Sequence, residues 1–494
     1  MAEHTTQDDD PPAELLEKDK ETKKKLVIDT ISSFCKDSSP FEIFRNMGEA
    51  LNDGSGELVV DILTGGLTNY SYKVHMEGKG SMFAKLSFPY ALWNPDRNVQ
   101  YDVKRAQAEY EMMSRYGELA PGCVAKAYFC EAIDDMMLLV TEWSTSDEQW
   151  SNQFIDGNVD LRIAGPFARS IAKLHCVAVG SNNDEIDPEY NTTVRPCMLT
   201  IFPLMQDTVD GFFKGDVDNR VSELARVLGK ETCDAIITKN EDDYSNTRDC
   251  LIHSDLHAFN ILVEPKPEVS LLEHFGPTGS FAVCDWEMAM VGPIGRDIGL
   301  LYTVPIACSV THAINGHAHI SLDMLDYLDV VWEAYANELQ TSGEKDEEFI
   351  RKAYQNTIAW CGWFLYIAYY TLKCQVAFLP LENSKDVDTL VESAGVIGLQ
   401  CLQWGYMPTE DLSVVELRAK LRALMEDEIR RTKKPASIRR RRSSMLRASG
   451  RRVSDGALHF SSTKSRRESS SSFHLSLNSQ QFWNANGIPG EIIE

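Results

Sequence analysis

The chain has 494 residues, of which 43% are hydrophobic and 25% are charged, and this composition is typical of a globular enzyme. Its length exceeds that of a minimal domain and suffices for a large two-lobed one. The formal net charge of -25 at pH 7 argues against a general nucleic-acid-binding protein.

The cysteines and the first residues indicate an intracellular protein. The 12 cysteines are scattered without a Cys-x-x-Cys pair, which favours reduced thiols over a disulfide framework. Residues 1–12 are polar and acidic, unlike a signal or transit peptide. The uncharged stretch 357–372 spans roughly sixteen residues, short of the ~20 that a membrane-spanning helix needs. We therefore expect a cytoplasmic protein without a transmembrane segment.

Composition divides the chain into four parts. Residues 1–23 are acidic and poor in apolar side chains, so we expect disorder there. Residues 24–145 are predicted to form a first lobe with strand-like runs, and residues 146–432 are predicted to form a second, mostly helical lobe. Residues 433–494 form a basic, Arg/Ser-rich tail that we also expect to be disordered.

The first lobe contains a hairpin pattern. Residues 57–63 and 70–76 are strand-like runs joined by a turn that contains Gly65 and Gly66, and a Gly-Gly turn between such runs is a strong hairpin signal. A third strand at 81–86 places Lys85 near its centre. Glycines let the backbone approach phosphate oxygens, and a lysine neutralises them. The alternative is a simple hairpin.

Two later blocks carry the candidate chemistry. A His-x-Asp motif ends at Asp255 and is followed by Asn260, and a second apolar run ends in Asp285 and Glu287. Mg²⁺ takes carboxylate and amide oxygens as ligands. We predict Asn260 and Asp285 as Mg²⁺ ligands, with Glu287 as a further one. Asp255 is predicted to orient an attacking hydroxyl and accept its proton. The alternative is a set of loop or capping acids.

These motifs occur in the order found in protein-kinase-like small-molecule kinases. The chain resembles this superfamily over about residues 40–425; its members include aminoglycoside phosphotransferases, choline/ethanolamine kinases and methylthioribose kinases. The resemblance implies an α+β, bilobal protein-kinase-like fold. Residues 24–145 would then be the nucleotide-binding N-lobe, with a small antiparallel sheet, and residues 146–432 the mostly helical C-lobe, which carries the catalytic and substrate-binding residues. It also implies ATP and Mg²⁺ as cofactors and a hydroxyl of a small metabolite as the phosphoryl acceptor.

The resemblance assigns three more residues to the nucleotide site. Asn69 follows the phosphate-binding glycines. The segment that ends at Glu109 resembles a methylthioribose kinase pattern, so Glu109 is predicted to pair with the strand lysine; the alternative is a solvated helix acid. Glu142 ends the strand that enters the interlobe hinge, where backbone groups meet adenine.

Methylthioribose kinase is the family that the chain most resembles, because of His-x-Asp-Leu-His and of Gly-Pro-Ile-Gly-x-Asp-Ile-Gly at 292–299. Asp297 in this segment is predicted to face the substrate, with a helix N-cap as the alternative. The arginine pair expected near residues 364–370 is absent, and Trp360 and Trp363 stand nearby. Such an aromatic wall could hold the quaternary ammonium of choline; the alternative is a buried aromatic helix.

The basic tail carries a separate signal. Paired arginines precede Ser443, Ser454 and Ser469, an arrangement that basophilic protein kinases favour, and phosphates there would lower the positive charge. A membrane or nucleic-acid patch, a localisation signal and a solvated tail are the alternatives. A catalytically inactive kinase-fold adaptor, regulated through this tail, is a further interpretation of the chain. The oligomeric state stays open, with a homodimer as one alternative.

Overall fold

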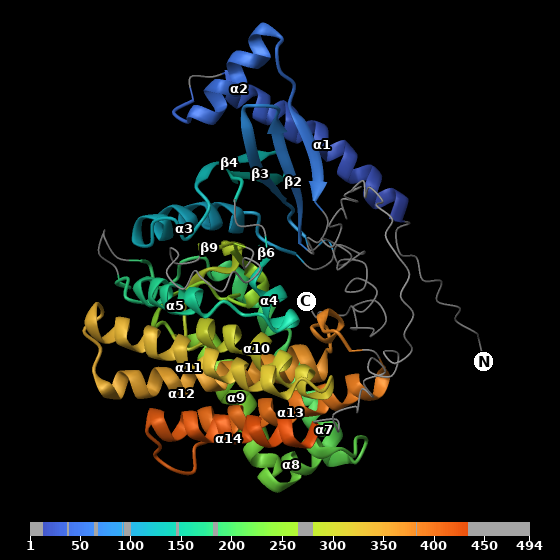
Figure 1. The fold of residues 1–494 in the computed structure, drawn as a ribbon, viewed down its shortest axis with the longest axis vertical. Helices are drawn as coiled ribbons and strands as arrows, with labels where there is room; N and C mark the ends of the chain where they lie inside the picture. Colours follow the sequence, from blue (N-terminus) through green and yellow to red (C-terminus); the bar gives the residue numbers. More distant parts are fainter. Residues whose placement is uncertain are drawn as a thin grey trace, which may run out of the picture.

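The computed structural model has a β-sheet region with flanking helices and, beneath it, a larger helical region (Figure 1). The predicted α+β, two-lobed arrangement is confirmed. The structure describes residues 13–36, 39–63, 68–90, 92, 100–144, 148–180, 186–264, 280–381 and 383–432.

The first region is built on a five-stranded sheet. The strands pair antiparallel in the order β1-β2-β3-β5-β4, and Lys85 of β3 stands opposite Leu139 of β5. Helix α3 (Arg105–Leu119) follows β3 and packs against β4 and β5. The strands are β1 (Val59–Leu63), β2 (Asn69–Met76), β3 (Gly80–Ser87), β4 (Ala127–Ile133) and β5 (Met136–Glu142).

The expected disorder of residues 1–23 is wrong for the residues that begin helix α1 (Ala13–Lys36). This polar helix start is held by the sheet: the Tyr70 hydroxyl donates to Asp19 Oδ2 (3.0 Å) and the Tyr72 hydroxyl donates to the carbonyl of Lys20 (3.3 Å). The helix then buries apolar side chains and continues into α2 (Glu42–Asp53). Composition alone did not reveal these contacts, because their partners lie 51 and 52 residues away.

The chain leaves the first sheet at Glu142 and enters a smaller sheet of the helical region. There, β6 (Glu148–Gln149) pairs with β8 (Ile261–Val263), and β8 pairs with β9 (Phe281–Val283). A second pair joins β7 (Cys250–Ile252) to β10 (Met290–Gly292). Both candidate catalytic motifs therefore follow short, buried strands that lie in one part of the fold.

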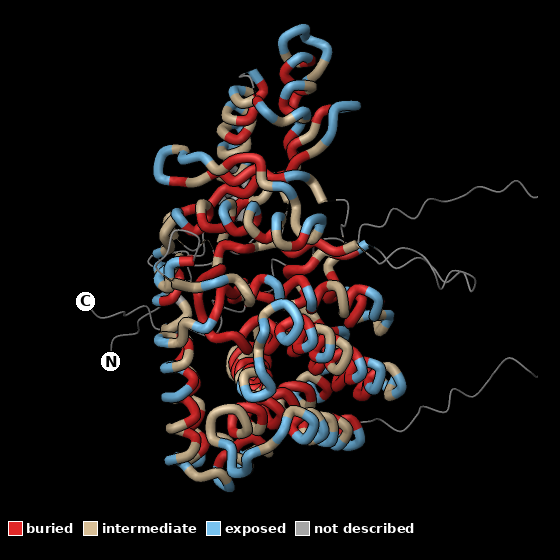
Figure 2. The backbone as a smooth tube through the Cα atoms, turned by 90° about the vertical axis from the view of Figure 1, so that its left-hand side faces the viewer, coloured by how far each residue is buried: buried red, intermediate tan, exposed pale blue. Residues whose placement is uncertain are grey.

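The helical region holds the larger hydrophobic core, and Figure 2 shows buried backbone concentrated inside it. Its α-helices are α4 (Trp150–Asp156), α5 (Leu161–His175), α6 (Arg195–Leu199), α7 (Phe202–Lys214), α8 (Arg220–Leu228), α9 (Lys230–Asn246), α10 (Arg296–Ile314), α11 (Ala318–Thr341), α12 (Glu347–Phe364), α13 (Ser384–Tyr406) and α14 (Val414–Thr432). Shorter helical turns are η1 (Thr192–Val194), η2 (Ala258–Asn260), η3 (Trp286–Met288), η4 (Leu365–Thr371, a π-helix) and η5 (Val376–Phe378).

Helix α10 is the centre of this core, and every one of its residues is buried. Glycines bring its start against α12: a Cβ on Gly295 would lie 2.2 Å from the Thr357 nitrogen, and one on Gly299 would lie 2.7 Å from the Thr357 carbonyl oxygen. Within the described residues, α10 is the one helix long and apolar enough to cross a membrane, and its window is 100% buried in the protein. A core helix meets the same criterion.

Several expectations concern residues that the structure does not describe. The tail at 433–494 and its serines lie outside the described residues, as do residues 1–12 and the turn with Gly65 and Gly66. The cysteines whose side chains are described are all free.

Candidate active site

The first motif forms a tight loop between β7 and β8 that brings Asp255 and Asn260 together. Asn260 Nδ2 donates to the carbonyl of Asp255 (3.0 Å) and to its Oδ2 (3.3 Å). The Asp255 carboxylate keeps 36% of its surface exposed, whereas Asn260 is buried. A partly exposed carboxylate is thus held by a buried amide.

Two histidines act on this loop: one affects the ionisation of Asp255, and the other fixes the position of the loop. His257 Nε2 lies 3.5 Å from Asp255 Oδ1. Burial opposes ionisation of Asp255, but the charge and hydrogen bond of His257 outweigh it and lower the pKa of this carboxyl. His253 donates from Nε2 to the carbonyl of Cys284 (3.0 Å), just before Asp285, and burial lowers the pKa of His253. A neutral His253 therefore links the two motifs, as a bracing residue should.

The second motif meets the strand lysine. Asp285 follows β9 in a left-handed conformation (φ 65°), and its Oδ1 lies 2.5 Å from Lys85 Nζ. Lys85 also pairs with Glu109 Oε2 at 2.8 Å, so the structure contains the predicted Lys85–Glu109 ion pair. Burial would lower the pKa of Lys85, but Asp285, Glu109 and Glu287 raise it well above its ordinary value. The ammonium group is therefore charged.

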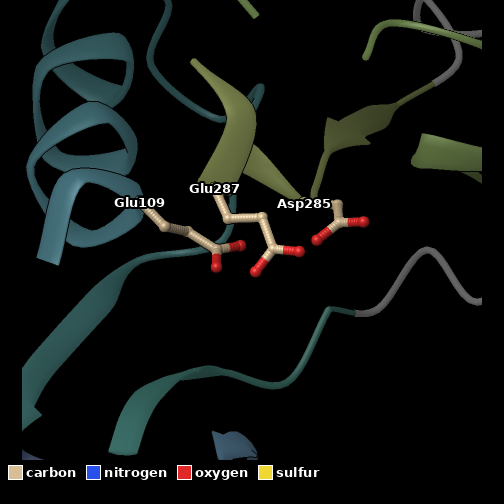
Figure 3. Close-up of side chains that lie close together, drawn as sticks. All are labelled: Glu109, Asp285 and Glu287. Atoms are coloured by element: carbon tan, nitrogen blue, oxygen red, sulfur yellow. The ribbon is translucent and has the colours of Figure 1, made fainter. Parts of the chain in front are cut away.

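Three carboxylates surround this ammonium group. Figure 3 shows Glu109 of α3 and Glu287 turned toward each other, with Asp285 beside Glu287. One oxygen from each lies within 4.8 Å of the others, a spacing that could hold a metal ion. Lys85 Nζ, at 3.4 Å from Glu287 Oε2, already supplies a positive charge to all three.

Glu287, predicted as a metal ligand, has both oxygens engaged by protein groups. Thr68 donates its hydroxyl to Oε1 (3.0 Å), and Asn69 Nδ2 (2.9 Å) and Arg105 Nε (3.1 Å) donate to Oε2. Burial would raise the pKa of Glu287, but Lys85 and Arg105 lower it to about 2. Glu287 thus lies in a buried network rather than at an open coordination position.

Asn69 and Glu142 are the other two predicted nucleotide-site residues, and both lie in the first sheet. Asn69 faces the network around Glu287, and Glu142 lies where the chain leaves the sheet. Asn69 is buried, and its Oδ1 accepts from Arg105 Nη2 (3.0 Å), so its amide serves the same network as Glu287. Glu142 is exposed at the end of β5, and its backbone N–H donates to the carbonyl of Lys126 (2.8 Å). Gly65 and Gly66 lie outside the described residues.

The prediction that Asp297 faces the substrate is wrong. Asp297 is 0% exposed, and both of its oxygens accept bonds from the first motif: His253 N donates to Oδ2 (2.7 Å) and Ser254 N to Oδ1 (2.8 Å). His175 Nε2 also lies 3.1 Å from Oδ2. Asp297 therefore fixes the backbone of the loop that carries Asp255.

The prediction of a substrate wall at Trp360 and Trp363 is also wrong. The two side chains are 0% and 1% exposed, so no acceptor can contact them. They do hold a cation, but it belongs to the chain: the guanidinium carbon of Arg296 lies 4.6 Å from the Trp360 ring and 5.0 Å from the Trp363 ring. The alternative of a buried aromatic helix is the correct one.

Comparison with known families shows which family the chain belongs to. Residues 60–315 match the model of the phosphotransferase enzyme family, which is more than half of the 494-residue chain. The chain belongs to the phosphotransferase enzyme family. The match includes both motifs and the strand lysine, so the protein is a small-molecule kinase. Of the residues predicted to face the substrate, Asp297 lies within the match, whereas Trp360 and Trp363 lie beyond it.

Solved structures similar to this phosphotransferase are distant. A protein assigned as a fructosamine-3-kinase from Haemophilus somnus 129PT is 11% identical, covers 72% of this chain and 96% of its own, and has a TM-score of 0.35. Its counterpart from Thermobifida fusca YX-ER1 is 16% identical over 70% and 95%, with a TM-score of 0.35. Aminoglycoside phosphotransferase APH(4)-Ia, with AMP-PNP and hygromycin B, is 12% identical over 74% and 99%, with a TM-score of 0.36. Curated protein sequences gave no match.

The phosphotransferase also has site residues that the motif analysis did not assign. Arg105 is 0% exposed and bonds Glu287, Asn69 and the carbonyl of Phe88 (2.8 Å). It stands four residues before Glu109, a spacing that places both on one helix face, and this signal could have found it. Arg296 had no such signal, because its partners lie far from it in the sequence, on two other helices and in the loop after β7.

Proposed function

We propose that the protein transfers the γ-phosphoryl group of ATP, with Mg²⁺, to a hydroxyl group of a small metabolite. One observation carries this proposal: Lys85 of the first sheet contacts Asp285 of the second motif and Glu109 of α3. Asp285 is joined through His253 to the loop of Asp255. A cation for phosphates, a metal-type acid and a catalytic-type acid therefore share one site, as phosphoryl transfer requires.

The oxygens that remain available suit Mg²⁺, which prefers hard oxygen ligands. Asn260 uses Nδ2 for its bonds to Asp255, which leaves Oδ1 to face a metal. Asp285 contacts Lys85 through Oδ1 and keeps 39% of its side chain exposed, which leaves Oδ2. Asn260 and Asp285 would hold the ion, which when bound neutralises and orients the phosphates. Glu287 is not part of this donor set, because both of its oxygens are engaged.

The chain's own residues supply the remaining steps. Asp255, ionised because of His257, accepts a hydrogen bond from the acceptor hydroxyl and takes its proton at a carboxylate oxygen as the oxygen attacks. Lys85 donates to phosphate oxygens, and Glu109 orients the lysine from the other side. Asn260 keeps Asp255 in place through its two bonds.

Methylthioribose is the first acceptor to test, since it is the substrate of the family that the motifs most resemble. Choline and ethanolamine are the second, but the aromatic wall that favoured them is buried around Arg296. A hydroxylated acceptor that is not a quaternary amine therefore fits the structure better. An inactive adaptor is disfavoured, because Lys85, Asp255 and Asp285 are all present and oriented.

An acceptor screen tests this function. ATP consumption would be measured with methylthioribose, choline, ethanolamine and sugar alcohols, and thermal shift would report binding of ATP with and without Mg²⁺. We expect ADP formation that depends on one acceptor class and on Mg²⁺. Asp255→Asn is the matched control and should keep the thermal shift while losing turnover. Nucleotide binding without turnover on any acceptor would support the adaptor instead.

A further inference from the structure

Arg296 and Asp297, adjacent at the start of α10, hold opposite sides of the residue before Asp255. Asp297 Oδ1 accepts from the backbone N–H of Ser254 (2.8 Å). Arg296 Nε donates to the Ser254 carbonyl (2.9 Å) and to its Oγ (3.1 Å). The N–H and the carbonyl of Ser254 are therefore both fixed by one turn of a fully buried helix.

Ser254 needs such support because its backbone is strained. Its φ is 70°, in the left-handed region that residues other than glycine, asparagine and aspartate rarely adopt. Strained backbone persists only where the surroundings over-determine it, and such strain occurs at functional sites. If one side of Ser254 were released, the peptide could relax to a commoner conformation and turn Asp255 away from its present direction.

Arg296 is a costly residue in this place. Its side chain is 1% exposed, and its guanidinium carbon lies 4.9 Å from the Tyr244 ring in addition to the two tryptophans. Its Nη1 is buried without a hydrogen-bond partner among the described residues, and burial lowers the pKa of Arg296 below its ordinary value. An apolar side chain would fill an aromatic enclosure at lower cost. An apolar side chain, however, could not donate a hydrogen bond to the Ser254 carbonyl.

The packing at the start of α10 fixes the position of the Arg296 guanidinium. Gly295 and Gly299 flank Arg296 and allow α10 to approach the backbone of α12, on which Trp360 and Trp363 lie. Trp360 is itself oriented by its Nε1–H, which donates to Asp243 Oδ2 (2.9 Å). The rings pack around the guanidinium carbon, while Nε bonds Ser254, so they limit the freedom of the side chain to leave this bond.

We propose that Arg296 is a positioning residue for the transfer reaction, which acts by fixing the Ser254 carbonyl so that Asp255 is presented to the acceptor hydroxyl. This inference rests on the proposed function for its kinetic consequence. Arg296 itself touches neither substrate nor nucleotide, because it is enclosed by the aromatic rings. Its effect is on the orientation of Asp255, and loss of orientation of that kind lowers the rate of the chemical step rather than binding.

The test compares Arg296→Lys with Trp360→Phe in the full-length protein. Arg296→Lys keeps the positive charge but lacks Nε, so kcat should fall about 100-fold while KM for ATP stays within about twofold. Trp360→Phe disturbs the same enclosure without removing the bond to Ser254. Its kcat should therefore fall by no more than about threefold, even if its Tm falls as far as that of Arg296→Lys. Equal losses of kcat in both variants would overturn the proposal.

Hydrogen exchange of the peptide that spans residues 250–262 gives a readout that does not need turnover. Arg296→Lys should speed amide exchange in this peptide, and Trp360→Phe should leave it near the wild-type rate. Unchanged exchange in Arg296→Lys would overturn the proposal even if activity were lost. If wild-type protein transfers phosphate to no acceptor, the proposed function fails, and the exchange result still decides whether Arg296 fixes the loop.

Discussion

The Nε atom of Arg105 lies 3.1 Å from Oε2 of Glu287, with side-chain exposures of 0% and 6%. This buried ion pair joins α3, beside the first sheet, to the turn after β9 in the helical region. Thr68 and Asn69 at the start of β2 bond the same carboxylate. Glu287 therefore connects the two lobes next to Lys85, at the place where a metal ligand was predicted.

The magnesium dependence of the reaction separates the roles of the two acids. Asp285→Asn should raise the Mg²⁺ concentration for half-maximal activity at least about tenfold, since it removes a carboxylate ligand of the ion. Glu287→Gln should change that concentration by less than about threefold, because its oxygens bond protein groups. A Mg²⁺ titration of both variants measures this, and a large shift in Glu287→Gln would make Glu287 a metal ligand.

The same Glu287→Gln variant should show a pH-dependent loss of stability. The folded pKa of Glu287 is about 2, below its ordinary value, because Lys85 and Arg105 outweigh the effect of burial. The stabilisation from its charge is present above the unfolded pKa of about 4.3 and is lost as the pH falls toward the folded value.

Denaturant unfolding of wild type and Glu287→Gln at pH 7 and near pH 3 measures this difference. The gap in free energy of unfolding should be widest at pH 7 and narrower near pH 3. A gap that grows as the pH falls would show that the charge of Glu287 is not stabilised by its cationic neighbours.

The orientation of Lys85 by Glu109 should appear in nucleotide kinetics. Glu109→Gln removes the charge that holds the lysine from the side of α3, so kcat/KM for ATP should fall at least about tenfold. Glu111→Gln is the matched control on the same helix, because Glu111 is exposed and its carboxylate accepts hydrogen bonds from Gln107 and Tyr190. Its kcat/KM should stay at the wild-type value; equal losses in both variants would argue against an orienting role for Glu109.

The sequence predicted the local positions of the motif residues better than it predicted which side chains are buried. Asp255, Asn260, Asp285 and Lys85 follow strands or lie in them, and short-range patterns determine such positions. The contacts of Asp297 and Trp360 are made with partners 43 to 122 residues away. Motif spacing carries no information about such packing, so both were placed at the substrate when they are buried.

Close helix packing explains two glycines of the segment at 292–299, Gly295 and Gly299. Gly299→Ala would put a Cβ 2.7 Å from the Thr357 carbonyl oxygen, and because backbone cannot move aside cheaply, the free energy of unfolding should fall by about 1–3 kcal/mol. Gly117→Ala in α3 is the control: its Cβ would meet a side chain at 3.4 Å, and it should be neutral or stabilise by up to about 1 kcal/mol. Thermal unfolding of both variants measures the difference, and an unaffected Gly299→Ala would contradict the packing of α10 on α12.

Turnover by Asp255→Asn is the most direct test of the account. With the acceptor that the screen identifies, the variant should bind ATP and Mg²⁺ with the wild-type thermal shift and should lose acceptor-dependent ADP formation by at least about 100-fold. That result would mean that the carboxylate of Asp255 carries the transfer. Turnover within a few-fold of wild type, in a variant that is folded and binds nucleotide, would contradict it.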